Sequence, residues 1–96
     1  MTEILHEVPE QRFVTQAEGH AARLDYIQDE GRLTITHTIV PPAIGGRGIA
    51  GQLVQAALEF ATRENLKVVP RCSYADAWMH KHPRFEALRA RARAGA

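Results

Sequence analysis

Residues 39–51 read Ile-Val-Pro-Pro-Ala-Ile-Gly-Gly-Arg-Gly-Ile-Ala-Gly and join the end of an alternating strand to the start of an amphipathic helix. Four of the last seven residues are glycine. Glycine lets a backbone approach a ligand closely, and the first turn of a helix offers unpaired N–H groups with a partial positive charge. The stretch therefore predicts a phosphate-binding turn. A tight turn that binds nothing is the plainer alternative.

Two common phosphate-binding motifs do not account for this turn. A Walker loop needs a lysine after its last glycine, and no lysine follows a glycine in this chain. Gly46, Gly48 and Gly51 have the spacing of the dinucleotide-binding fingerprint. However, the next predicted strand carries no acidic residue at its end, and too little chain follows to complete that fold. We treat this match as a coincidence.

Outward from this stretch, the chain predicts an α/β protein. An antiparallel meander is expected from strands at residues 11–16, 20–28 and 32–40. The following helix, parallel strand and two short helices are expected at residues 47–64, 66–71, 73–81 and 83–93. The parallel strand is reached by a right-handed crossover. We therefore expect one helix packed on a central sheet, with two short helices at the end.

Local signals refine this outline. In the third strand, alternation predicts that Leu33, Ile35, His37 and Ile39 share one face. In the long helix, a stripe of Ile49, Leu53, Ala57 and Phe60 is predicted to pack on the sheet.

The element ends carry signals of their own. Asn65 is a left-handed stop for the long helix, and Ser73-x-x-Asp76 reads as a capping box. Pro70 cannot donate to a ladder, so it indicates an edge or a strand that faces a ligand. Phe85 and Leu88 are predicted to face inward from the last helix.

Several segments together resemble the GCN5-related N-acetyltransferases. Val40-Pro41-Pro42 followed by Gly46-Arg47-Gly48-Ile49-Ala50 is similar to the family motif written Gln/Arg-x-x-Gly-x-Gly/Ala. Pro70-x-Cys72-Ser73-Tyr74 and His82-Pro83-x-Phe85 resemble a subfamily of very small members. The resemblance covers nearly the whole chain. Gly45 departs from the usual Gln or Arg, which removes one contact to the pyrophosphate, and Arg84-Phe85 replaces the usual Glu-Tyr.

This resemblance implies a minimal fold of that family, with acetyl-CoA as cosubstrate. Its pantetheine arm is expected between two splayed parallel strands, bonded to the backbone of the strand that ends at Val40. The residues expected to contact it are Ile39, Val40, Gly45, Gly46, Arg47, Gly48, Ile49, Ala50 and Gly51.

Cys72 is the sharpest catalytic candidate. It precedes a predicted helix whose dipole favours the thiolate, and the resemblance places it near the thiol end of coenzyme A. We expect either a transient acetyl acceptor or a mixed disulfide with the coenzyme. A small buried hydrophobic side chain is the alternative.

Direct attack by an amine needs a base instead of a nucleophile. His37 and His82 are the main candidates, with His82 favoured over the neighbouring His80 by its His-Pro element. A hydrogen-bonded core histidine is the favoured interpretation of His37. Tyr74 is a candidate proton donor to the leaving thiolate, or a packing residue. The spacing of His80, His82 and Cys72 matches no common zinc pattern, so no metal is predicted.

Composition limits the possible partners. The 96 residues, 45% hydrophobic, predict one domain over 1–96. A net charge of +1 gives no global field for nucleic acid, although Arg89, Arg91 and Arg93 make the tail basic. One cysteine and the absence of a signal pattern predict a cytoplasmic location. No apolar run approaches the roughly 18 residues of a membrane span, so no membrane partner is expected.

The sequence thus predicts an acetyl-CoA-binding N-acetyltransferase that acts on an amine of a small molecule or a protein. The first alternative is a non-enzymatic module that binds acetyl-CoA, with Cys72 as an acylation or redox switch. The second, a nucleic-acid binder using the tail arginines, ranks below both. The sequence does not predict an oligomeric state.

Overall fold

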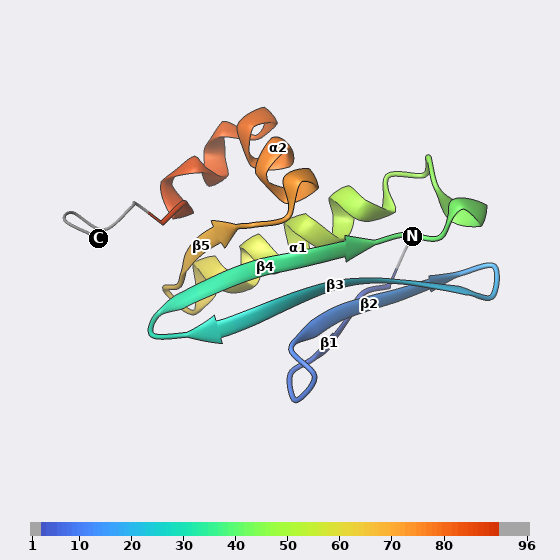
Figure 1. The fold of residues 1–96 in the computed structure, drawn as a ribbon, viewed down its shortest axis with the longest axis horizontal. Helices are drawn as coiled ribbons and strands as arrows, with labels where there is room; N and C mark the ends of the chain where they lie inside the picture. The colour runs from blue at the N-terminus through green and yellow to red at the C-terminus, as the bar shows by residue number, and fades with distance from the viewer. Residues whose placement is uncertain (1–2, 91–96) are drawn as a thin grey trace.

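A five-stranded sheet in the order β1-β2-β3-β4-β5 organises the computed structural model, which describes residues 3–90 (Figure 1). Its strands are β1 Leu5–Glu7, β2 Arg12–Ala17, β3 His20–Asp29, β4 Arg32–Ile39 and β5 Lys67–Pro70. Strands β1 to β4 pair antiparallel, and β5 runs parallel to β4. The predicted meander and parallel strand are confirmed. The prediction missed β1, because three residues are too few to show an alternating pattern.

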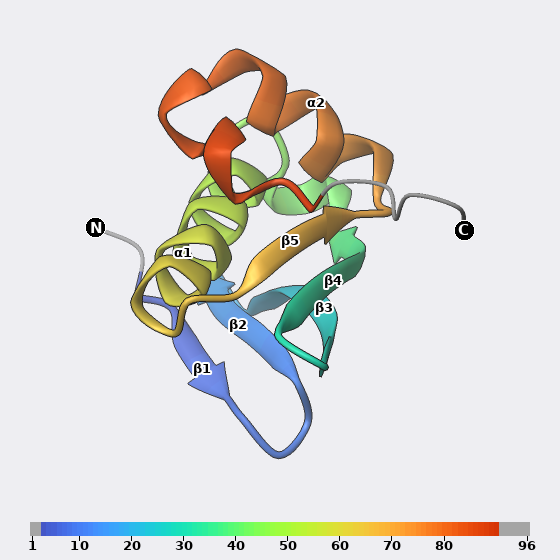
Figure 2. The same ribbon diagram turned by 90° about the vertical axis from the view of Figure 1, so that its left-hand side faces the viewer.

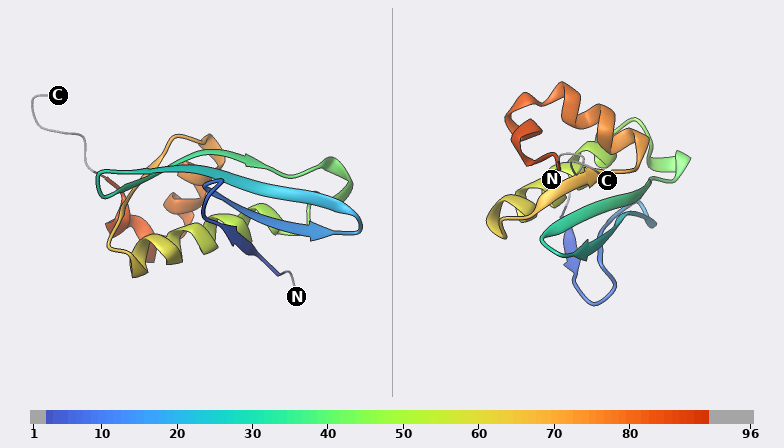
Figure 3. Two further views of the ribbon diagram at one scale, coloured as in Figure 1. Left: turned by 90° about the horizontal axis from the view of Figure 1, so that it is seen from below. Right: turned by 60° about the vertical axis from the view of Figure 1, so that its left-hand side comes forward.

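The helices lie on one side of this sheet (Figures 2 and 3). They are η1 Pro42–Ile44, α1 Ile49–Arg63, α2 Ser73–Lys81 and η2 Pro83–Leu88. α1 crosses the sheet, and α2 and η2 pack beside it (Figure 2). Among residues 3–90, no helix covers the opposite face, which we call the helix-free face. No described helix has the length and apolar character needed to cross a membrane.

The core lies between α1 and the sheet. α1 contributes Leu53, Val54, Ala57 and Leu58 with no exposed surface, and the strands contribute a matching set. The fully covered strand residues include Leu24, Leu33, Ile35 and Val68. Of the predicted stripe, Ile49, Leu53 and Ala57 are buried and Phe60 is half-buried.

The end of α1 follows the prediction closely. Asn65 adopts a left-handed φ of 58°, and the Leu66 N–H donates to the Ala61 carbonyl at 2.8 Å. This pair of features is a Schellman closure, which satisfies carbonyls that the helix end leaves free. The predicted stop at Asn65 is therefore confirmed.

A one-residue bulge in β4 overturns the predicted strand faces. Tyr26 pairs with Ile35 but Asp25 pairs with His37, so Thr36 is an extra residue. Its hydroxyl donates to the Asp25 carbonyl at 3.2 Å. Because side chains alternate, one extra residue reverses every later side chain. His37 and Ile39 are therefore exposed rather than sharing the buried face of Leu33 and Ile35.

The last predicted helix, 83–93, is also wrong in type and length. Pro83–Leu88 is a 3-10 helix, and beyond it the Ala90 N–H donates to the Val68 carbonyl at 2.8 Å. Arg89 forms an isolated parallel bridge with Val68, so the chain joins the edge of β5. Residues 91–93 lie outside the described part. The prediction that Phe85 and Leu88 face inward is confirmed.

Candidate functional site

The glycine-rich turn leaves the start of α1 open. Gly46 and Gly48 have φ values of 78° and 77°, a conformation that side chains rarely adopt. A Cβ atom at either position would meet nothing within 4 Å. Gly48 precedes α1 without a side-chain cap, and the first turn holds no acidic residue. Within the helix, the first N–H to donate is that of Gln52, to the Gly48 carbonyl. The N–H groups of the residues before Gln52 therefore have no partner within the helix.

The two outer glycines of this turn have other tasks. The Gly45 N–H donates to the Pro42 carbonyl at 3.1 Å, so it is already used inside the turn. A Cβ on Gly51 would lie 2.9 Å from Trp78 Nε1 and 3.4 Å from Tyr74 Oη. Gly51 therefore lets two side chains of α2 approach the first turn of α1. This packing explains that glycine without any ligand.

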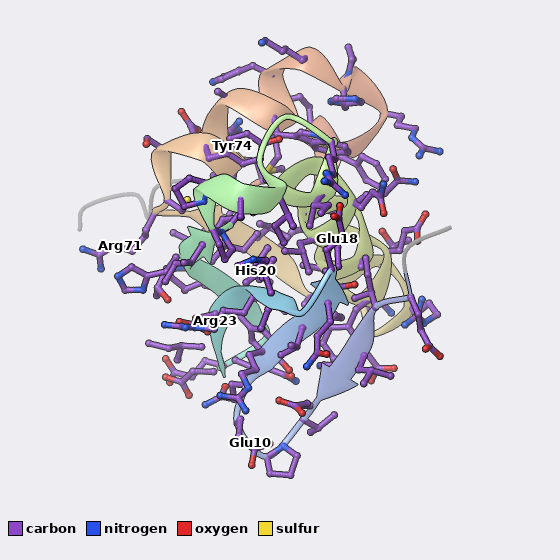
Figure 4. All side chains as sticks on the ribbon, turned by 90° about the vertical axis from the view of Figure 1, so that its right-hand side faces the viewer. Glu10, Glu18, His20, Arg23, Arg71 and Tyr74 are labelled. Atoms are coloured by element: carbon purple, nitrogen blue, oxygen red, sulfur yellow. The ribbon has the colours of Figure 1, made fainter. Side chains whose placement is uncertain are left out.

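Arg47, inside the turn, contacts a distant hairpin. Its guanidinium forms an ion pair with Glu18, at the tip of the β2–β3 hairpin (Figure 4). Both side chains remain accessible, at 47% and 62% exposure. Such an exposed pair contributes little to stability, so Arg47 can exchange Glu18 for another anion at small cost.

Cys72 is the residue that precedes α2, which corrects the predicted capping box. Ser73 is the first residue of α2, and Asp76 pairs with Arg89 rather than closing a box. The half-buried Cys72 thiol donates to Thr38 Oγ1 at 3.5 Å. Sequence reasoning chose Ser73 because serine is a common cap. The sequence does not show which of the two adjacent residues, Cys72 or Ser73, adopts the extended conformation of the N-cap.

The environment of Cys72 favours its thiolate. Burial alone would raise the pKa of the thiol, but the Thr38 hydroxyl and the backbone N–H groups of Thr38, Tyr74 and Ala75 donate to the thiolate once it forms, and together they lower the pKa further than burial raises it. Cys72 lies at the N-cap of α2 without a side-chain capping hydrogen bond, and the dipole of α2 also favours negative charge on its sulfur. The net effect is a pKa below the ordinary value.

The two parallel strands part beside this thiol. The pairing of β4 with β5 stops at Ile35 and Pro70, where the N–H groups of Arg71 and Cys72 both donate to the Ile35 carbonyl. Among the described residues, β4 has no strand partner on its β5 side beyond that point. Such an edge can bond an extended ligand through its backbone. Ile39 and Val40, the predicted pantetheine contacts, follow on this part of the chain.

A sequence profile described as GCN5-related N-acetyl-transferase matches residues 12–88 of the chain. The chain belongs to this family. The matched range includes β2 to β5, the glycine-rich turn, α1, α2 and η2. The chain therefore carries an acetyltransferase domain, and the recognition made from residues 40–50, 70–74 and 82–85 is confirmed.

Known relatives support the assignment over different lengths. Protein NATD1 from Gallus gallus and from Homo sapiens are each 43% identical to the chain over 49 residues, which is 51% of this chain. The matches span 44% and 43% of those relatives, so less than half of their length is represented. The solution structure of a GCN5-like protein from Staphylococcus aureus superposes with a TM-score of 0.74 at 28% identity. It covers 97% of this chain and 92% of that protein.

Within this GCN5-related domain, only two of the four catalytic candidates lie at the start of α2. Tyr74 follows Cys72 by two residues, and its hydroxyl points at Gly51 in α1. Burial raises the pKa of the Tyr74 phenol, so the group keeps its proton at neutral pH. The phenol therefore borders the first turn of α1, whereas the thiol lies beside Thr38 of β4.

His82 lies at the other end of α2. Ten residues separate it from Cys72, or about 15 Å along a helix. Its Nδ1 donates to the Trp78 carbonyl at 2.8 Å, and its ring stacks on the Trp78 ring at 3.6 Å. These contacts give His82 a structural part at the end of α2.

His37 lies on the helix-free face because of the bulge at Thr36. Its Nδ1 is 3.2 Å from the Thr36 hydroxyl, and it borders an open cavity with Arg71. The prediction of a core histidine is wrong. His37 is accessible to a molecule approaching from the face opposite α1.

Three residues of this domain escaped the sequence-based prediction. Trp78 lies four residues after Tyr74, and this helical spacing was available as a signal. Thr38 reaches Cys72 only because of the bulge, and Glu18 reaches Arg47 only through the fold. Neither contact leaves a pattern in the sequence. Among residues 3–90, no group of three or more potential metal ligands converges.

Proposed function

We propose that the protein transfers the acetyl group of acetyl-CoA to an amine. Membership of the GCN5-related family supports an acetyltransferase, and the open start of α1 carries the proposal for the cofactor. Acetyl-CoA supplies an acetyl thioester and negatively charged phosphates. The N–H groups of Gly48, Ile49 and Ala50 are suited to the pyrophosphate, because a helix start attracts anions.

Neighbouring groups extend this binding site. Arg47 is placed to exchange Glu18 for a phosphate, which forms stronger charge-assisted hydrogen bonds. The free edge of β4 suits the pantetheine amides near Ile39 and Val40. Gly45 is the weakest of the predicted contacts, because its N–H already serves Pro42.

The proposed reaction needs a neutral amine. The amine nitrogen attacks the thioester carbonyl carbon, a C–N bond forms, and the C–S bond breaks with its electron pair on sulfur. The amine proton lost to a base balances the proton that the thiolate gains. We assign the base to His37, which is exposed on the helix-free face, and the acid to Tyr74, which retains its proton.

A single substitution separates cofactor binding from folding. Ala50→Glu places a carboxylate in the first turn of α1, where the helix dipole favours it. We therefore expect unchanged or higher thermal stability. Acetyl-CoA binding by calorimetry should fall by at least about tenfold, because the new charge faces the phosphates. Ala50→Gln, similar in volume and uncharged, is the control and should bind far better than the glutamate variant. Equal affinities for the two variants would reject the phosphate site at α1.

A second function is favoured by the lowered pKa of Cys72. In this alternative, the Cys72 thiolate attacks the thioester carbonyl carbon, an acetyl–cysteine bond forms, and free coenzyme A leaves. Mass spectrometry after incubation with acetyl-CoA measures the adduct, with Cys72→Ser as control. An adduct that persists with amines present supports an acylated binding module. An adduct consumed by amines supports a covalent transferase, and full turnover by Cys72→Ser supports direct attack.

A further inference from the structure

An open cavity of about 360 Å³ lies on the helix-free face, lined by Ile27, Thr34, Thr36, His37 and Arg71. This volume is at the lower end of the range for small-molecule sites, enough for an amino acid or the end of a peptide. Strands β3 and β4 and the residue that follows β5 supply the lining, so the cavity has a rigid floor. Ile27 is 52% exposed within it, an apolar surface that no described helix covers.

Arg71 is the cation of this cavity that lacks a partner. Within residues 3–90 it forms no ion pair and no side-chain hydrogen bond. Arg23 lies on the same side of the sheet (Figure 4), but both oxygens of Asp25 accept from it at 3.2 Å. The charge of Arg23 is therefore balanced, whereas that of Arg71 is available to an anion. Two threonine hydroxyls and the His37 ring are the neighbouring polar groups.

The cavity lies on the helix-free face, and the proposed thioester site lies next to it on the opposite side of the sheet. Arg71 and Cys72 are consecutive, and their N–H groups share the Ile35 carbonyl at 3.1 and 3.0 Å. Arg71 lines the cavity on the helix-free face, whereas the Cys72 thiol lies beside Thr38. The pairing of β4 with β5 ends at this point. A molecule held in the cavity is therefore beside the opening between the two strands.

Resting on the proposed acetyl transfer, we infer that this cavity takes the acceptor and that Arg71 selects an amine carrying a carboxylate. A guanidinium matches a carboxylate through two parallel N–H···O bonds. With the carboxylate on Arg71, the amine end of a compact acceptor lies over Thr36 and His37. Free amino acids and peptides that begin with an acidic residue both carry this chemistry. An unsubstituted alkylamine does not.

Binding is tested directly, without turnover, on the ¹⁵N-labelled full chain. The probes are L-alanine against L-alaninamide, and the peptide Asp-Ala-Ala-amide against Asn-Ala-Ala-amide. We expect the carboxylate member of at least one pair to shift the amide signals of Thr34, Thr36 and Arg71. It should bind about five to ten times more tightly than its amide partner, as for an accessible charged hydrogen bond. The pair that responds distinguishes a small acid from a peptide.

Matched arginine variants decide the assignment. Arg71→Gln should remove the preference for the carboxylate, whereas Arg23→Gln on the same face should keep it. Both changes are at accessible positions, and overlaid spectra verify that each variant folds. Equal binding of paired probes, a preference that survives Arg71→Gln, or no shift at tens of millimolar probe would overturn the inference.

A parallel acetyl-CoA titration separates this inference from the proposed function. If acetyl-CoA binds to Arg71→Gln with unchanged affinity while the carboxylate preference is lost, both proposals are supported. If acetyl-CoA binds and the probes do not, only the acceptor site is rejected. If the probes bind and acetyl-CoA does not, the cavity remains an anion site and the acetyl transfer fails.

Discussion

Helix α1 ends with Asn65 in a left-handed conformation and the Leu66 N–H bonded to Ala61, whereas it begins behind Gly48 without a capping side chain. Arg63 complements the dipole at the closed end, but no acidic residue does so at the open end. One end is thus built to complete the helix. The other leaves its N–H groups available, and the proposed acetyl-CoA site depends on that difference.

The largest effect is expected at the open end, from Gly51→Ala. The new Cβ would lie 2.9 Å from Trp78 Nε1, and Trp78 is held by its stack on His82. The clash should cost about 1–3 kcal/mol against the roughly 1 kcal/mol that alanine gains in a helix, so we expect a net loss of up to about 2 kcal/mol. Denaturant unfolding measures the loss, and Trp78, the sole tryptophan, reports it by fluorescence.

A double-mutant cycle provides the control for this clash. Trp78→Phe removes the Nε1 atom, so Gly51→Ala should destabilise the Trp78→Phe background less than the parent. Strictly additive free energies of unfolding would show that Gly51 and Trp78 do not interact. Circular dichroism follows unfolding in the variants that lack tryptophan.

At the closed end, Asn65→Ala should cost about 1 kcal/mol of stability, because alanine tolerates a positive φ poorly. Asn65→Gly is the matched control and should retain the stability of the parent. Acetyl-CoA affinity, measured by calorimetry, should be unchanged in both variants. A change in affinity at this position would contradict the separation of the two ends.

A smaller effect is expected from Glu18→Gln. Removal of the carboxylate frees Arg47 and reduces repulsion of the phosphates, so acetyl-CoA should bind about two to five times more tightly at low salt. Glu10→Gln changes the net charge equally at a different turn and should have little effect (Figure 4). Weaker binding by Glu18→Gln would mean that Glu18 positions Arg47 rather than competing for it.

The smallest effect is a pH dependence of stability that arises from His6, which packs near the C-terminal end of α1. His6 stacks on Phe13 at 4.1 Å and contacts Phe60, and burial together with the charge of Arg63 lowers its pKa. Below the ordinary value of 6.5, the unfolded chain therefore binds more protons than the folded one. Stability should fall as pH decreases through this range.

Urea unfolding at pH 7.5 and 5.5 measures this loss. His6→Gln should reduce the difference in stability between the two pH values. An identical difference in the variant would assign the pH dependence to other groups. This pH dependence should not depend on the N-terminal end of α1, because His6 lies against Phe60 near the C-terminal end of the helix.

Much of the fold follows from local patterns. The meander, α1, β5 and α2 each have a clear period or a clear punctuating residue, and the glycine-rich turn combines several such signals. β1 is held by its pairing with β2 rather than by its own sequence. η2 is short because Arg89 bonds to Asp76 and Glu86 while the following N–H joins β5. Long-range contacts of this kind leave no local period.

The parts of the candidate site that are formed by glycine backbone conformations could be predicted from the sequence. The parts that depend on the pairing register of β4 could be predicted less well. The turn at Gly46 and Gly48 could be located because glycine has a specific conformational use. The positions of His37 and Thr38 could not, because the bulge at Thr36 is fixed by pairing with β3. His82 was favoured by its motif, but its hydrogen bond to Trp78 depends on the end of α2.

The bulge at Thr36 also has a consequence for comparing or redesigning such chains. Counting residues from either end of β4 gives opposite answers about which side chains point inward, so an alignment gap within 34–38 exchanges the two sides of the strand. Deleting Thr36 would remove the bulge and keep Thr38 on the α1 side, whereas regular pairing of the full-length strand would turn His37 toward α1 and move Thr38 away from Cys72. The bulge in this strand, more than the identity of any residue in it, therefore decides which reactive groups meet.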